Sequence, residues 1–133
     1  MSLSVREKFE PAGINDESMM SRFLEECPLD FFLVAMPYTL LDQDVLDDIF
    51  PKCTSLGVGV VVGAPYASGI LASGAIQGAK YKYAEATPQV IQKVRSFESL
   101  CDDHQIPLKA AALQFPLGHP LVAAIIPGAF QPE

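Results

Sequence analysis

The sequence predicts an α/β fold built on a parallel sheet, specifically part of a (β/α)8 TIM barrel. Segments with helical and strand patterns alternate along the chain, as they do in right-handed βαβ units. The predicted strands are apolar along their whole length, so both faces of each strand must be covered. A complete barrel takes roughly 250 residues, and this chain has 133. We therefore expect one domain, residues 1–133, that forms about half of such a barrel.

The first elements are two strands around a helix. Residues 10–15 (EPAGIN) are a candidate stub of an edge strand. A helix is predicted over residues 16–27, because Asp16 is a suitable N-cap and the apolar residues behind it repeat at helical spacing. The apolar run 29–36 is then long enough for a buried strand, and Pro37 ends it.

The middle of the chain contains a helix, a strand and a long loop. Apolar residues at helical spacing predict a helix over 41–57, kinked at Pro51 and closed by Gly57. The apolar run 58–62 predicts a second buried strand. Residues 72–86 are rich in Gly, Ala and Tyr and show no period, which predicts a long loop.

The last elements are two helices and a strand. A helix over 88–101 is predicted from Thr87 at the N-cap and a proline at the first helical position. Another begins at Pro107 and ends near residues 116–118. The apolar run 121–126 predicts a final strand, which a Pro-Gly pair ends.

Composition and charge limit the classes of partner. The net charge is −7 and no basic stripe is present, so neither nucleic acid nor an anionic membrane is an expected partner. No apolar run is long enough to span a bilayer and no signal peptide is recognisable, so we expect a cytoplasmic protein. Half of the residues are hydrophobic, which for a small domain indicates a rich core or a covered apolar surface.

Three cysteines are widely spaced and form no CxxC pair. Cys27, Cys53 and Cys101 each fall near a predicted helix end. This spacing favours buried free thiols in a reducing compartment over a disulfide or a metal site. We therefore predict no metal centre.

The stretch VGVVVGAPYASGIL (58–71) has the composition of a ligand-binding loop. A buried strand ends in Gly63-Ala64-Pro65, and a small polar turn at Ser68 and Gly69 follows. Small residues let a backbone approach a ligand closely, and exposed N–H groups bind phosphate. A GxGxxG or Walker motif is absent from the sequence, so a doubly wound nucleotide-binding fold is disfavoured.

Four segments together resemble one family. They are DFFLVAMPYTLLDQ, GVGVVVGAPYASGIL, AAALQFPLGHP and AAIIPGA, in this order. They are similar to the C-terminal half of an aldo-keto reductase, strands 5 or 6 to 8 of its barrel, in the bacterial sugar-dehydrogenase branch. The resemblance covers the chain from about Gly13 to Glu133.

The resemblance implies a nicotinamide dinucleotide bound at the C-terminal ends of the strands. Asn15 would bind the nicotinamide carboxamide, the loop after residue 62 would hold the pyrophosphate, and the last turn would lie near the adenosine. Phe130 and Gln131 stand where members that prefer NADP carry a basic residue, so NAD is weakly preferred over NADP. Gly63 stands where many members have an aromatic that stacks on the nicotinamide. The candidate cofactor-binding residues are Asn15, Gly63, Pro65, Ser68, Gly69, Pro127 and Gly128.

The resemblance also implies that no catalytic residue lies in this chain. The family's Asp, Tyr, Lys and His come from the first half of the barrel. Among possible substitutes, His104 is expected at an exposed helix end and His119 in a turn on the side opposite the cofactor. The Tyr81-Lys82-Tyr83 side chains are expected to point apart. The remaining candidates, Asp42, Asp44, Asp47 and Asp48, are expected to be helix-cap and surface carboxylates.

Two functional hypotheses remain open. In the first, the chain is the cofactor-binding side of an NAD(P)-dependent sugar or aldehyde dehydrogenase and is inactive alone, and it is open whether the isolated chain still binds the dinucleotide. In the second, it is a non-catalytic structural or binding module. Because an incomplete ring leaves its inner face and two strand edges bare, we expect a homo-oligomer such as a dimer, or a partner that supplies the N-terminal half-barrel.

Overall fold

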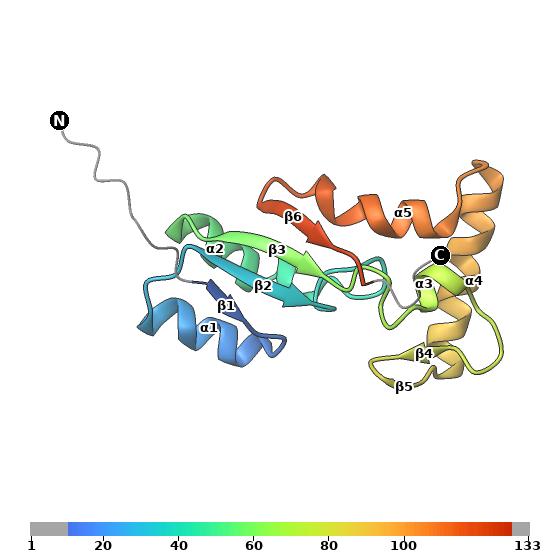
Figure 1. Ribbon diagram of the computed structural model, residues 1–133, viewed down its shortest axis with the longest axis horizontal. Helices are drawn as coiled ribbons and strands as arrows, with labels where there is room; N and C mark the ends of the chain where they lie inside the picture. Colours follow the sequence, from blue (N-terminus) through green and yellow to red (C-terminus); the bar gives the residue numbers. More distant parts are fainter. Residues whose placement is uncertain (1–10, 129–133) are drawn as a thin grey trace.

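Four parallel strands form the central sheet of the protein. A computed structural model describes residues 11–128 (Figure 1). The sheet has the order β1-β2-β3-β6, and each neighbouring pair is parallel. The strand order follows the chain, with helices on the connections, as in a (β/α)8 barrel. The predicted α/β fold with a parallel sheet is confirmed, and its four strands are β1 (Pro11–Gly13), β2 (Phe31–Ala35), β3 (Gly59–Gly63) and β6 (Val122–Ile126).

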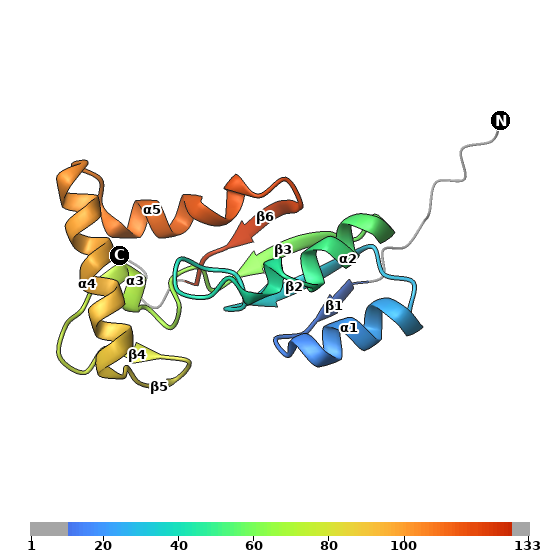
Figure 2. The ribbon, with the colours of Figure 1, turned by 180° about the vertical axis from the view of Figure 1, so that it is seen from behind.

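Helices cover one face of this sheet. They are α1 (Glu17–Glu26), α2 (Ile49–Leu56) and α5 (Leu108–Gln114), and Figure 2 shows α2 in front of β2 and β3. Alternate strand residues are buried beneath them, because strand side chains alternate between the two faces. The largest fully buried core side chains on this face are Met20, Phe32, Val34, Val45, Ile49, Phe50, Val60 and Val62.

The opposite face of the sheet is apolar and only partly covered within residues 11–128. Leu33 and Val61 lie side by side on it and are half-buried, and Ala124 beside them is exposed. Ile126, at the end of β6, is 54% exposed. The two faces therefore match the expectation for strands cut from a ring, in which helices cover the outside and the interior requires further chain.

A second group of elements extends from the carboxyl end of β3. It comprises the short helix α3 (Ile70–Ser73), the antiparallel hairpin of β4 (Lys80–Tyr81) and β5 (Ala84–Glu85), and α4 (Pro88–Asp103). They share a second apolar cluster with α5, and Figure 1 shows them beyond the end of the sheet. The prediction of a long loop over 72–86 is therefore wrong in part, because this segment contains the end of α3 and the hairpin.

Helix ends follow the sequence signals in most cases. The Asp16 carboxylate accepts a hydrogen bond from the Met19 amide at 3.0 Å, and the Thr87 hydroxyl accepts one from the Val90 amide at 3.4 Å. The predicted kink at Pro51 is wrong. A 3-10 turn (Asp44–Leu46) precedes α2, so the proline is the third residue of that helix. Amides of the first turn have no partner within the helix, so a proline is tolerated there.

The three cysteines are free. Cys53 is buried, and burial raises the pKa of its thiol to about 11, so it is inert. Cys27 is exposed, which corrects the expectation that all three are buried.

A further 3-10 turn (Phe115–Gly118) joins α5 to the last strand. None of the helices in the described part of the chain is both long and apolar enough to cross a bilayer.

We predict that Gly57→Ala lowers the free energy of unfolding by about 1 kcal/mol, because an L-residue is strained in the left-handed region. Gly57 ends α2 with φ 70°, and its amide and that of Val58 bond back to Thr54 and Cys53. A methyl group there meets nothing within 4 Å, so strain alone is measured. Urea unfolding is the measurement.

Gly118→Ala is the matched control for this prediction. Its added methyl group also meets nothing within 4 Å, and the left-handed strain is absent. We expect its free energy of unfolding to stay within about 0.5 kcal/mol of the wild-type value. Equal losses in the two variants would contradict the assignment of the effect to the backbone of Gly57.

Candidate functional site

The carboxyl ends of the strands meet at one edge of the sheet because the strands are parallel. The chain turns sharply there, since Met36 after β2 and Ala64 after β3 both have positive φ, 75° and 50°. The Ala64 amide bonds to the Ile126 carbonyl at 3.2 Å, which extends the pairing of β3 with β6 past the strand end. Two clefts open beside these turns.

The first cleft, here called the Asn15 cleft, has a volume of about 340 Å³. The Asn15 side-chain oxygen accepts a hydrogen bond from the Ala35 amide at 2.9 Å. This bond fixes the side chain and leaves its NH2 group available as a donor. Half of the other lining residues are charged, and the whole lining consists of Asn15, Glu17, Ala35, Met36, Pro37, Asp42, Asp44, Lys82 and Tyr83.

The second cleft, here called the Ser68 cleft, has a volume of about 500 Å³ and an uncharged lining. Its floor is a loop in which three successive residues, Ala67, Ser68 and Gly69, have positive φ. The Ser68 hydroxyl donates to the Met36 sulfur at 3.7 Å and accepts from the Tyr83 amide at 3.3 Å. The residues that line the cleft are Ala64, Tyr66, Ala67, Ser68, Gly69, Tyr83 and Gly128.

The structure brings together some of the candidate cofactor-binding residues. Ser68, Gly69 and Gly128 share the Ser68 cleft, whereas Asn15 lines the other cleft. The remaining three lie next to these linings. Gly63 is the last residue of β3, Pro65 is buried in the following turn, and Pro127 is exposed after β6. Phe130 and Gln131, on which the cofactor preference depends, lie outside the described residues.

Asp42 links the hairpin to the strand ends, a contact that the sequence analysis missed. Its carboxylate accepts a hydrogen bond from the Tyr81 hydroxyl at 2.5 Å and pairs with the Lys82 ammonium at 3.2 Å. The Asp42 side chain is 14% exposed. The expectations that Asp42 is a surface carboxylate and that Tyr81 and Lys82 point apart are both wrong, because the hairpin turns both side chains onto this carboxylate.

The environment of Tyr81 makes it a poor proton donor near neutral pH. Burial, followed by the hydrogen bond to and the charge of Asp42, raises the pKa of Tyr81 to about 12. Burial lowers the pKa of Lys82, but the hydrogen bond and charge of Asp42 outweigh it and raise that pKa overall. Near neutral pH the Tyr81 phenol therefore stays protonated and the Lys82 ammonium stays charged, as expected of a structural contact.

Of the other candidate groups, Asp44 lines the Asn15 cleft, and the two histidines lie outside both linings. His104 is the exposed C-cap of α4. The His119 ring accepts a hydrogen bond from the Leu121 amide at 3.1 Å and lies 4.9 Å from the Phe50 ring, before the start of β6. Within residues 11–128, no cluster of three His, Cys, Asp or Glu side chains is suited to hold a metal ion.

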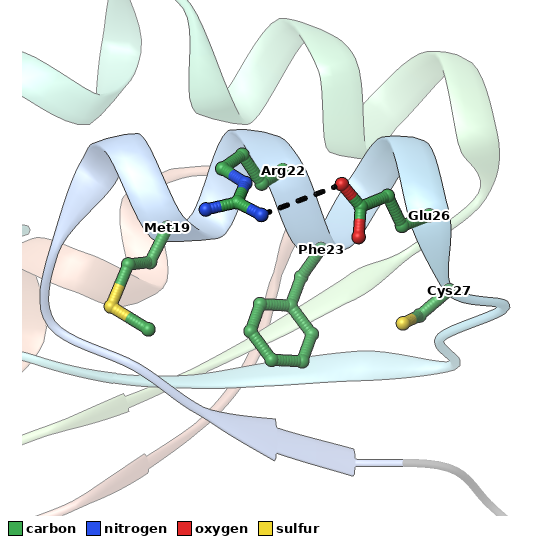
Figure 3. A pocket seen from close by; sticks show the side chains of 5 residues that line it. All are labelled: Met19, Arg22, Phe23, Glu26 and Cys27. Carbon is green, nitrogen blue, oxygen red and sulfur yellow. Dashed lines mark ion pairs between the residues drawn. The ribbon is translucent and has the colours of Figure 1, made fainter.

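A third hollow, of about 260 Å³, runs along α1. Figure 3 shows Met19, Phe23 and Cys27 on one side of this helix, beside the ion pair of Arg22 with Glu26 at 3.7 Å. Met19 is 49% exposed. α1 and its C-cap Cys27 supply the whole lining, so this hollow has the character of an uncovered packing surface rather than of a reaction site.

The parallel sheet and its covering helices are those of part of a (β/α)8-type protein, with two clefts at the carboxyl ends of the strands. Comparison with known proteins agrees, since the family model for the Aldo/keto reductase family matches residues 15–133. The chain belongs to the aldo/keto reductase family.

Two curated relatives share part of their length with this chain. It is 36% identical over 121 residues to pyridoxal 4-dehydrogenase of Microbacterium luteolum, which covers 91% of this chain and 35% of the relative. It is 32% identical over 114 residues to D-threo-aldose 1-dehydrogenase of a Pseudomonas species. That match covers 85% of this chain and 35% of the relative. The chain thus spans about a third of the length of these relatives.

Among solved structures, the apo form of the aldo-keto reductase AKR11C1 from Bacillus halodurans is similar. The TM-score is 0.68 at 26% identity, over 90% of this chain and 39% of that one. The glycerol dehydrogenase AKR11B4 from Gluconobacter oxydans superposes with a TM-score of 0.63 at 17% identity. This superposition covers 88% of the present chain and 38% of the glycerol dehydrogenase. These similarities confirm that the described fold is that of part of a barrel.

We predict that the phenol of Tyr81 ionises near pH 12 instead of 10. The folded chain holds this proton more tightly than the unfolded chain, so the contribution of Tyr81 to folding is lost as pH rises from 10 toward 12. The difference in tyrosinate absorbance between the wild type and Tyr81→Phe gives the midpoint. In an Asp42→Asn background the midpoint of Tyr81 ionisation falls but stays above pH 10, because the Tyr81 side chain is still partly buried. A midpoint at 10 in the wild type would refute the described contact.

Proposed function

We propose that this chain is the cofactor-binding part of an NAD(P)-dependent oxidoreductase that acts on a sugar or another aldehyde in the cytoplasm. The observation that carries the proposal is the pair of adjoining clefts at the carboxyl ends of four parallel strands, which contain Asn15 and Ser68. Family membership and the names of the two relatives, both dehydrogenases, support it. The free cysteines suit a reducing cytoplasm.

The described residues fit a nicotinamide dinucleotide. The NH2 group of Asn15 can donate to a carboxamide oxygen. The uncharged Ser68 cleft contains no Lys or Arg in its lining, so a pyrophosphate there would be held by backbone N–H groups such as that of Ser68. When bound, the nicotinamide ring supplies hydride exchange with a carbonyl or an alcohol. We further propose a weak preference for NAD over NADP, on the identities of Phe130 and Gln131.

We propose that groups beyond this chain supply the proton transfer. Tyr81 and Lys82 are held by Asp42 beside the clefts, and the pKa of the Tyr81 phenol is raised, which is opposite to what a proton donor near pH 7 requires. The chain therefore binds and orients the dinucleotide without transferring hydride on its own. Turnover of an aldose by the purified chain would overturn this.

Asn15→Asp tests the dinucleotide site. The aspartate keeps an oxygen that can accept from the Ala35 amide, but it lacks the NH2 donor and adds a negative charge. We expect NADH affinity to fall about tenfold or more, since leaving a polar ligand group unsatisfied costs about 1–3 kcal/mol. Fluorescence titration with NADH measures the change.

Gln89→Glu provides the control for this substitution. It makes the same amide-to-carboxylate change at an exposed position in the first turn of α4. We expect its NADH affinity to equal that of the wild type. A wild-type chain that shows no affinity for NADH would remove the basis of the proposed function.

A second candidate function is favoured by the uncovered apolar face of the sheet. The half-buried Leu33 and Val61 and the exposed Ile126 together form apolar surface that water disfavours. We propose that a second copy of the chain or a separate N-terminal half-barrel covers it. A non-catalytic oligomer without affinity for NADH would be a structural or binding module.

Ile126→Lys tests the covering of this face. We expect the wild-type chain to be larger than its 14.4 kDa monomer in solution and the variant to shift toward the monomer, because a lysine charge is costly to bury. Light scattering after gel filtration gives the mass. Leu100→Lys on α4 is the control, since Leu100 is 55% exposed and Ile126 is 54% exposed. The same mass in both variants and the wild type would contradict the proposal.

A further inference from the structure

Tyr83 occupies the junction of the two clefts. Among residues 11–128 it is the one residue shared by the Asn15 cleft and the Ser68 cleft. Its side chain is 79% exposed, which is unusual for so large an aromatic residue. An exposed ring at a cleft offers a flat apolar face to a ligand, at little loss of conformational freedom.

The backbone around Tyr83 is a tight turn of unfavourable composition. Tyr81 pairs with Ala84 in the hairpin, so Lys82 and Tyr83 form a two-residue loop. Both have positive φ, 49° and 66°. Turns of this kind usually contain Asn and Gly, because side chains are strained at positive φ. Such strain persists where surrounding contacts hold the turn, and it concentrates at functional sites.

Contacts hold this turn from two sides. On one side, Asp42 accepts from the Tyr81 hydroxyl at 2.5 Å and pairs with the Lys82 ammonium at 3.2 Å. On the other, the Tyr83 amide donates to the Ser68 hydroxyl at 3.3 Å. Asp42 follows β2 and Ser68 follows β3, so both contacts attach the tip of the hairpin to the strand ends.

We propose that Tyr83 is a ligand-contact residue whose ring covers the junction and packs against a ligand that extends across both clefts. Asp42 is the positioning residue that holds the turn in place. This inference rests on the proposed function, in which the ligand is a nicotinamide dinucleotide. A dinucleotide has two planar ring systems joined by a flexible pyrophosphate, so an aromatic face between its subsites restricts the bound conformation.

The experiment is a fluorescence titration of the full chain with NADH. We expect Tyr83→Ala to weaken binding by about tenfold, the upper end of what one aromatic contact contributes. Tyr83→Phe keeps the ring, so its affinity should stay within about twofold of the wild type. Lys80→Ala, in the same hairpin but outside both linings, should bind as the wild type does.

A double-mutant cycle separates positioning by Asp42 from direct contact. We expect Asp42→Asn to weaken NADH binding in the wild type and to have no further effect in the Tyr83→Ala background. Additive losses would overturn the positioning role of Asp42, because they would show that it acts independently of the ring.

Three outcomes overturn the inference, and they are distinguishable. If the wild type binds NADH and Tyr83→Ala binds it equally well, the role of Tyr83 is refuted and the proposed function stands. If the wild type does not bind NADH, both fall. Loss of affinity in Tyr83→Phe equal to that in Tyr83→Ala would also refute packing by the ring, since the hydroxyl would then be responsible.

Discussion

The register of the parallel strands is the constraint on which the site depends. β2 and β3 pair residue for residue from Phe31 with Gly59 to Ala35 with Gly63, so their ends are flush. Between β3 and β6 the register shifts at Val60 and Val61, and Gly63 therefore pairs with Ile126. Because strand side chains alternate between faces, a one-residue shift exchanges the residues that point to each face. Val122 pairs with the buried Val60 before the shift and is buried in the core, and the shift leaves Ile126 on the open face.

The sharp turns after the strands are possible because the sheet holds them. Met36 and Ala64 have positive φ without being glycine, which costs about 1–3 kcal/mol each. Met36 is buried, and its sulfur accepts from the Ser68 hydroxyl. The Ala64 amide is bonded to the carbonyl of Ile126. The stability of the sheet thus compensates for strain in the loops that line the clefts.

Local signals in the sequence were sufficient for the elements that local contacts determine. Caps at Asp16 and Thr87 and the left-handed residue Gly57 all act within a few positions of their own helix. The hairpin was missed because its tip is held by Asp42, 39 residues before its partner Tyr81. The turn residues Lys82 and Tyr83 give no local signal of a hairpin, because Gly and Asn, which usually mark two-residue turns, are absent from it.

The two clefts differ in the charge of their linings, a difference that is independent of any relative. Three carboxylates and one ammonium line the Asn15 cleft, and the ammonium is already paired with Asp42. Burial, and then the charge of Asp44, raises the pKa of Glu17, as expected where carboxylates repel one another. An anionic group is therefore disfavoured in this cleft, whereas the uncharged Ser68 cleft presents no such repulsion. In the proposed function, the phosphates of a dinucleotide would therefore lie in the Ser68 cleft, and its uncharged or positively charged ring would lie beside Asn15. This orientation would bring the ring to the ends of β1 and β2, on the side where further strands would complete the barrel.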